Sequence, residues 1–143
     1  MRPFEARVPV RFAEIDRAGI AYYPRFFHYF HVAFEEFFAG RVGVPYPEMI
    51  DRRRVGFPTV HAECDYRSPL RYGDLLRIRV SVERIGRTST VFLYRVRTGR
   101  GLAAEARITV VCVDMDTFRP RSIPRDCLRV FRRHRTGSRA RRG

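Results

Sequence analysis

The residues best suited to chemistry lie in one stretch of the chain, between Phe12 and Gly40. A polar turn there carries one carboxylate, Asp16, followed by Gly19, and a predicted helix begins at Pro24. The first turn of a helix offers free backbone N–H groups and partial positive charge. A carboxylate beside such donors could act as a nucleophile or general base next to a site that stabilises an oxyanion. The simpler alternative is that Asp16 only caps a helical turn.

Two further sets of side chains could bind a metal, but each has an ordinary structural explanation. His28 and His31 are three residues apart and can share one helix face, yet no further ligands accompany them. We interpret both as core or rim residues. His61, Glu63 and Asp65 alternate along a predicted strand and share a face, which is also typical of a solvated strand surface. We therefore predict no metal site.

Glu14 stands two residues before Asp16, so the two could form a carboxylate dyad, although spacing alone does not establish one. The sequence contains no GxGxxG, GxxxxGK[ST], HExxH or GxSxG motif. These absences disfavour a nucleotide-binding enzyme, a zinc protease and a serine hydrolase.

The elements that must position these residues are one helix and several strands. The predicted helix runs from Pro24 and ends at Gly40, a residue suited to a left-handed helix end. Its apolar residues form two adjacent stripes, one of Phe26, Phe30, Ala33 and Phe37 and the other of Phe27, Phe34 and Phe38. A helix this apolar should be buried along most of its length.

Strands are predicted on both sides of this helix in the sequence. Period-two alternation predicts them at residues 5–12, 58–68, 75–85, 88–97 and 102–114, with Pro9 at an edge or a strand end. Short connections favour antiparallel neighbours. The fold class is therefore α+β, with one long buried helix wrapped by an antiparallel sheet of about five strands. One such layer leaves apolar surface uncovered, so we expect a homo-oligomer.

Composition fits one domain in 143 residues with 45% hydrophobic residues. No apolar run approaches the roughly 20 residues that cross a membrane, and the N-terminus lacks an apolar signal core. We expect a cytoplasmic protein without a membrane partner. The three cysteines are an odd number without a CxxC pair, which predicts reduced thiols.

All 29 basic residues are arginine, and the net charge is +14. Seven of these arginines lie in residues 129–143 with no acid among them, which leaves +7 for residues 1–128. We predict a domain at 1–128 and a basic, disordered tail at 129–143 that is dispensable for activity. No nucleic-acid-binding motif accompanies the tail, so we expect no nucleic-acid partner.

Several segments, in order, resemble one known family. The stretch from Asp16 to Phe26, DRAGIAYYPRF, resembles the active-site segment of hotdog-fold acyl-CoA thioesterases of the 4-hydroxybenzoyl-CoA thioesterase family. The resemblance continues at 56–60, 65–74, 84–89, 112–114 and 119–124, and covers about residues 5–128. It implies the hotdog fold, in which a curved antiparallel sheet wraps a long helix. It also implies a dimer or tetramer with the acyl group at the dimer interface.

The resemblance also implies roles for individual residues. Asp16 takes the place of the catalytic carboxylate, as nucleophile or general base, and the Tyr23 backbone N–H that of the donor to the thioester carbonyl. Gly19 permits the turn and the close approach of substrate. The residues that it implies around the acyl group are Tyr22, Pro24 and Phe26. Those that it implies for binding coenzyme A are Arg84, Arg87, Thr88 and Ser89, with Arg121 as a further candidate. Coenzyme A enters only as part of the substrate, and no cofactor is implied.

The implied reaction is hydrolysis of a small aromatic or a short- or medium-chain acyl-CoA to the free acid and CoA. A non-catalytic acyl-CoA-binding protein and a thioesterase acting on acyl carrier protein are the alternatives. Hotdog hydratases and dehydratases are disfavoured, because they use a helix histidine with a carboxylate, and His28 and His31 lie well inside the helix.

Overall fold

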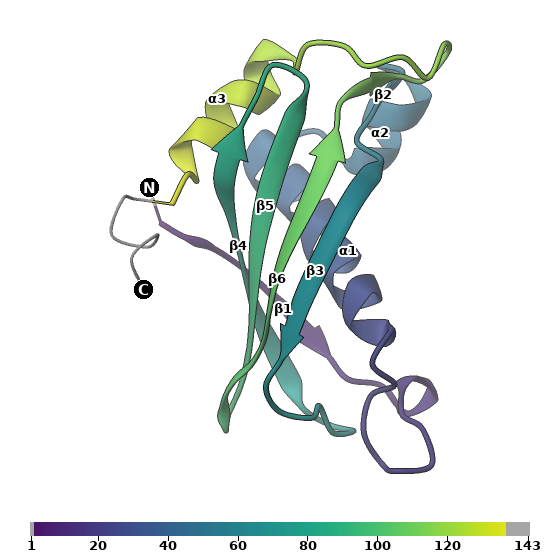
Figure 1. The fold of residues 1–143 in the computed structure, drawn as a ribbon, viewed down its shortest axis with the longest axis vertical. Helices are drawn as coiled ribbons and strands as arrows, with labels where there is room; N and C mark the ends of the chain where they lie inside the picture. The colour runs from purple at the N-terminus through teal and green to yellow at the C-terminus, as the bar shows by residue number, and fades with distance from the viewer. Residues whose placement is uncertain (1, 137–143) are drawn as a thin grey trace.

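The computed structural model describes residues 2–136 as one sheet with a long helix against one face (Figure 1). The five-stranded sheet has the order β1-β4-β5-β6-β3, and every neighbouring pair is antiparallel. Its strands are β1 (Phe4–Pro9), β3 (Thr59–Tyr66), β4 (Leu75–Ile85), β5 (Ser89–Thr98) and β6 (Gly101–Val111). The predicted order of one strand, one helix and four strands is confirmed, and Pro9 ends an edge strand.

The long helix is α1 (Arg25–Phe37), and it continues without a break into a π-helical turn, η2 (Phe38–Val42). The structure buries both stripes of the helix except at Phe27, whose side chain is 38% exposed. The predicted end at Gly40 is wrong, because the left-handed residue that closes the helix is Gly43, with φ of 82°. The extra turn keeps Phe38 in the core, where its ring packs against Phe57 at 5.4 Å.

Three short elements lie beyond the top end of α1 in Figure 1. One is helix α2 (Tyr46–Asp51), and the other two, β2 (Val55–Gly56) and β7 (Val113–Asp114), pair in a small second sheet. The Tyr46 hydroxyl accepts a hydrogen bond from the Phe57 backbone N–H at 2.9 Å. These contacts close the end of the core that is remote from Asp16.

A third helix, α3 (Arg125–Arg133), shows that the prediction of a disordered tail from residue 129 is wrong for residues 129–136. Phe131 is fully buried, and its ring packs 5.2 Å from that of Phe92. After the helix, the Val82 N–H donates to the His134 carbonyl at 2.9 Å and the Thr136 N–H donates to the Val82 carbonyl at 2.8 Å. This segment therefore pairs with the part of β4 that β1 leaves open. Residues 137–143 of the predicted tail lie outside the described residues.

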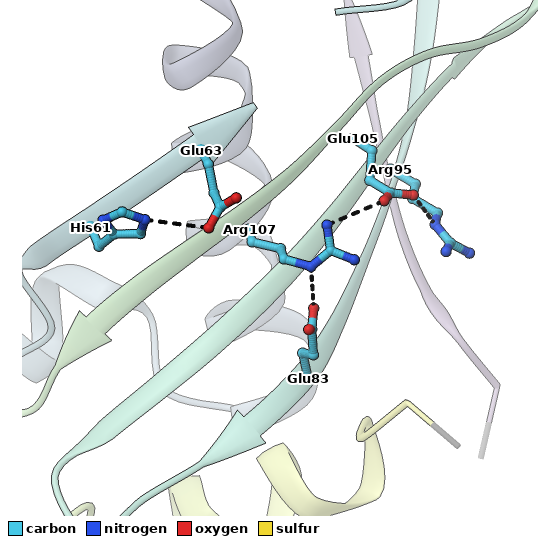
Figure 2. Close-up of polar contacts among 6 residues, drawn as sticks. All are labelled: His61, Glu63, Glu83, Arg95, Glu105 and Arg107. Carbon is cyan, nitrogen blue, oxygen red and sulfur yellow. Dashed lines mark hydrogen bonds and ion pairs between the residues drawn. The ribbon is translucent and has the colours of Figure 1, made fainter. Parts of the chain in front are cut away.

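The face of the sheet opposite α1 is polar and carries cross-strand ion pairs (Figure 2). Arg107 on β6 contacts Glu83 at 2.7 Å and Glu105 at 3.5 Å, and Arg95 on β5 contacts Glu105 at 2.8 Å. Figure 2 also shows His61 and Glu63 on β3 paired at 3.3 Å. Both of these side chains are 64% exposed, as expected for a solvated strand surface.

Two further expectations concern cysteines and membranes. Cys112 and Cys127 are buried, Cys64 is half-buried, and all three are free thiols, as predicted. Burial raises the pKa of the Cys64 and Cys112 thiols to about 11, which keeps them protonated at neutral pH. Within residues 2–136, no helix is long and apolar enough to cross a membrane.

Candidate active site

The Asp16 turn is a compact loop that backbone hydrogen bonds hold at the start of α1. The Asp16 N–H donates to the Ile20 carbonyl at 2.9 Å, and the Gly19 N–H donates to the Asp16 carbonyl at 3.0 Å. Gly19 has φ of +80°, a conformation that a residue with a Cβ adopts only with strain. An antiparallel bridge between Ile15 and Ala21 brings the two ends of the loop together, so Asp16 lies beside the chain that enters the helix.

The Asp16 carboxylate is exposed and makes one local hydrogen bond, because its Oδ1 accepts from the Ala18 N–H at 2.8 Å. The structure thus contains the local cap that the simpler interpretation predicted. That bond orients the carboxylate and uses only part of its capacity, since a carboxylate has about four acceptor positions on two oxygens. Capping and chemistry are therefore compatible roles for this side chain.

The residues just before α1 include Tyr23, whose backbone N–H the family resemblance assigns as the hydrogen-bond donor to the thioester carbonyl. Pro24 is the N-cap residue, with helical φ and ψ of −65° and −19°, and the Phe26 N–H donates to the Tyr23 carbonyl at 3.2 Å. Within residues 2–136, no acceptor receives the Tyr23 N–H. This donor stands at the positive end of the helix dipole, where partial negative charge is stabilised.

Glu14 links the Asp16 loop to helix α1, a role that the sequence did not predict. Its Oε1 accepts from the Tyr29 hydroxyl at 2.9 Å and from the Arg11 N–H at 2.8 Å, while its backbone carbonyl accepts from the Tyr22 N–H at 3.3 Å. Burial first, and the Glu14 contact second, raise the pKa of Tyr29. The Glu14 side chain is therefore an anchor that ties the Asp16 loop to the helix.

A cavity of about 280 Å³ opens beside Tyr23, just before α1. Phe26, which the resemblance places at the acyl group, lines it together with Tyr23 and with Tyr66 from the end of β3, whereas Pro24 does not. The Tyr66 ring lies 4.8 Å from that of Phe26, edge to face, and its hydroxyl donates to the Tyr23 carbonyl at 3.3 Å. Tyr22 is not among the lining residues and packs instead on the ring of Tyr23 at 5.2 Å.

Tyr66 is a site residue that sequence reasoning missed. The available signal was its place in the segment 65–74, which resembles the family, and its alternation along a strand whose inward face points toward α1.

A second hollow of about 250 Å³ lies between α1 and strands β3 and β6. The lining is aromatic and aliphatic, and His31 is its polar residue besides Thr59. His31 is 58% exposed and lies 3.5 Å from Glu35, one helical turn away, which agrees with its interpretation as a rim residue. Among the described residues, no group of three or more His, Cys, Asp or Glu side chains is arranged to hold a metal ion.

The residues that the resemblance links to coenzyme A lie at the opposite end of the sheet from Asp16. Arg87 and Thr88 form the connection between β4 and β5, at the top of Figure 1, whereas the Asp16 loop is at the bottom. Leu70 and Arg71, just before β4, contact the Asp16 loop at Ala21 and Ile20. The 11 residues of β4 separate the two places, which at about 3.3 Å per residue is roughly 35 Å.

The coenzyme A candidates form one surface at that end. The Arg87 side chain donates to the Ser122 hydroxyl at 3.0 Å, and the Arg87 carbonyl accepts from the Ile123 N–H at 3.1 Å. Arg121 lies beside them, and its side chain donates to the Ser122 carbonyl at 3.1 Å. The structure therefore brings the 84–89 connection and Arg121 together with each other, and not with Asp16 of the same chain.

Comparison with known proteins agrees with the fold. Residues 10–131 match the family described as the thioesterase-like superfamily. A solved structure of a hypothetical protein from Aquifex aeolicus is 31% identical, with a TM-score of 0.84 over 90% of this chain and 99% of that one. The structure of a gentisyl-coenzyme A thioesterase is 26% identical, with a TM-score of 0.81 over 87% of this chain and 99% of that one.

Among curated sequences, the 1,4-dihydroxy-2-naphthoyl-CoA hydrolase of Synechococcus elongatus is 29% identical over 125 residues, which are 87% of this chain and 91% of that protein. The chain belongs to the thioesterase-like superfamily and has its hotdog fold. Its class is that of the thioester hydrolases.

Proposed function

We propose that the protein hydrolyses acyl-CoA thioesters whose acyl group is a small aromatic ring or a short to medium chain. The observation that carries this proposal is the free Tyr23 N–H at the start of α1, flanked by the Asp16 loop and by a cavity of about 280 Å³ lined with aromatic rings. Aromatic walls favour a flat acyl group through edge-to-face contacts. Two relatives named above act, by their names, on gentisyl-CoA and 1,4-dihydroxy-2-naphthoyl-CoA, both of which carry ring-containing acyl groups.

The chemistry follows from the charge that develops at the carbonyl. The thioester oxygen accepts a hydrogen bond from the Tyr23 N–H, and negative charge on that oxygen strengthens the bond as the tetrahedral intermediate forms. The C–S bond then breaks and the electron pair leaves on sulfur as a thiolate, a stable leaving group that needs no strong general acid.

Asp16 supplies the attack by one of two routes. Its carboxylate oxygen bonds to the carbonyl carbon and forms an anhydride that water hydrolyses, or it takes a proton from a water molecule that attacks instead. A single turnover in ¹⁸O-labelled water separates the routes. The direct route leaves the first-turnover product acid unlabelled when attack on the anhydride occurs at the Asp16 carbonyl, and it places ¹⁸O in the Asp16 carboxyl group. The water route labels the product at once and leaves Asp16 unlabelled.

The open edge of β3 supports assembly of the site from two subunits. Every residue of β3 is exposed except the half-buried Cys64, although the strand lies against α1 and β6. An unpaired edge of this kind invites pairing with a second strand. Antiparallel pairing of two β3 strands about a two-fold axis places the partner's 84–89 connection at the same end as Asp16. The arginines at that connection would then meet the phosphates of the CoA whose thioester lies at Tyr23.

The test of this function is a panel of acyl-CoA substrates with released thiol as the readout. We expect the highest kcat/KM among hydroxybenzoyl-, gentisyl-, dihydroxynaphthoyl- and medium-chain acyl-CoA. Asp16→Asn should lower kcat by at least about 100-fold, as expected for loss of a nucleophile or base, while the melting temperature and oligomeric mass stay unchanged. An Asp16→Asn variant with near-normal rates would overturn the mechanism, and tight binding without turnover by the wild type would favour an acyl-CoA-binding protein.

A further inference from the structure

A third hollow on the molecule is strongly basic and lies away from Asp16, the aromatic cavity and the open edge of β3. Its volume is about 330 Å³, and it lies between the start of β1, the outer face of β4 and β5, and the segment that follows α3. Figure 1 shows these parts converging beside β4, where the end of α3 approaches the start of β1. Four arginines line it, namely Arg79, Arg95, Arg133 and Arg135.

Little negative charge balances these arginines. Arg79 and Arg95 are directly opposite each other in the register of β4 and β5, a like-charge pairing that destabilises a sheet. Arg95 contacts Glu105 through Nε, which leaves its two terminal nitrogens for another acceptor (Figure 2). Among the described residues, Arg79, Arg133 and Arg135 have no acidic side chain within ion-pair distance.

Two residues that line the same hollow each carry a buried polar atom without a hydrogen-bond partner in the described part of the chain. The atoms are Nε2 of His134, a residue that is 6% exposed, and Oγ1 of Thr136. Both atoms are almost inaccessible, and the His134 ring packs 5.1 Å from that of Phe37 in the core, so they lie behind the wall of the hollow. Main-chain hydrogen bonds to Val82 hold both residues in place.

We propose that this hollow is a binding site for a small phosphate-bearing anion. Arginine recognises phosphate oxygens through paired, charge-assisted hydrogen bonds, and four guanidinium groups around one space suit a multiply charged oxyanion. The hydroxyl of Ser81 supplies a neutral donor on the same wall. An anion there would relieve the repulsion between Arg79 and Arg95. It would also fasten the segment after α3 to β4.

The experiment is calorimetric titration of the full chain with inorganic pyrophosphate at constant ionic strength set with chloride. We expect one site per chain. Arg79→Ala should weaken pyrophosphate binding about tenfold, as expected for loss of a charged hydrogen-bond donor. Arg77→Ala is the matched control, because Arg77 is an exposed arginine two residues earlier on the same face of β4 and does not line the hollow. It should leave binding unchanged.

Ser81→Ala provides a second variant with no change in charge, and it should also weaken binding while the melting temperature in chloride stays within a few degrees. Absence of pyrophosphate binding to the wild type would overturn the proposal. Equal weakening by Arg77→Ala and Arg79→Ala would also overturn it, because it would show diffuse attraction to a basic face.

A competition arm identifies the source of the phosphate. Adenosine 3′,5′-bisphosphate carries two phosphates of coenzyme A without the thioester. If it displaces pyrophosphate, and Arg79→Ala raises KM for acyl-CoA, the hollow binds the phosphates of the substrate. If pyrophosphate binds while the bisphosphate does not compete, the ligand is a separate phosphorylated metabolite. Either result keeps the anion site and decides between its two sources.

Discussion

The two ends of the sheet are built in different ways, and the difference matches the two tasks that we propose for them. At the start of α1, main-chain hydrogen bonds fix the Asp16 loop. They leave the Asp16 carboxylate exposed and, among the described residues, the Tyr23 N–H without an acceptor. At the other end, α3 and the 119–124 segment are held by aromatic packing of Phe131 and by side-chain contacts such as Arg53–Asp126 at 2.7 Å. Chemistry needs fixed geometry, whereas phosphate binding needs charge on adaptable side chains.

This comparison predicts that efficient hydrolysis of acyl-CoA needs both the Asp16 end and the Arg87 end of the sheet. Mixing two variants, each defective at one end, is the strongest test. Asp16→Asn lacks the carboxylate, and Arg87→Ala should mainly raise KM, because phosphates contact the site equally in ground and transition states. In a random mixture of the two, a composite site is intact once in each heterodimer, so about a quarter of wild-type sites return. We expect activity at low substrate to exceed the average of the two separate proteins severalfold.

The mixture is measured after denaturation and refolding together, with each variant refolded alone as the control. Activity equal to the average of the two would show that Asp16 and Arg87 serve the same chain or that Arg87 has no part in binding. A substrate lacking the nucleotide part of CoA should show no defect with Arg87→Ala, and the defect with acyl-CoA should shrink as salt rises, because salt screens exposed ion contacts.

The sequence was sufficient to predict the sheet and the helix because their signals are local. Strand β4 has the bounds predicted from its alternation, and the stripes of α1 are buried except at Phe27. Helix α3 was missed because four of its nine residues are arginine and it runs into the arginine-rich end of the chain, although Cys127, Val130 and Phe131 are buried. The separation of Asp16 from Arg87 was also missed, because a family resemblance orders residues along the chain and gives no distance between them.

Truncation tests how much the stability of the folded chain depends on residues 134–136, which follow α3. Deleting residues 134–143 removes two main-chain hydrogen bonds to Val82 and the packing of His134 on Phe37, whose rings are 5.1 Å apart. We expect a loss of about 2 kcal/mol in the free energy of unfolding. At about 2–4 °C per kcal/mol, the melting temperature should fall by several degrees.

The matched control deletes residues 137–143 only. These residues carry three of the seven arginines, and the shorter deletion retains His134 and Thr136. We predict an unchanged melting temperature and acyl-CoA rate for this shorter deletion. Equal losses from both deletions would mean that residues 134–136 contribute nothing of their own to the far end.

The smallest expected effect is a pH dependence of the free energy of unfolding that arises from His134, just after α3. Burial first, and then the positive charges of Arg41, the N-terminus and Arg133, lower the pKa of His134 in the folded chain below its ordinary value of 6.5. The unfolded chain therefore binds a proton more readily than the folded chain does. The stability that neutral His134 provides is complete above pH 6.5 and is lost as the pH falls from there toward the folded pKa.

Melting temperatures of wild type and His134→Leu, measured between pH 8 and pH 5, isolate this contribution. The wild type should lose more stability than His134→Leu over the acidic half of that range, by less than the effect of deleting residues 134–143. His28→Gln, a change at an exposed histidine on α1, is the control and should follow the wild type. Added pyrophosphate should reduce the difference, because a bound anion beside His134 favours its charged form. Parallel curves for wild type and His134→Leu would show that His134 titrates alike in the folded and unfolded chains, contrary to its burial among positive charges.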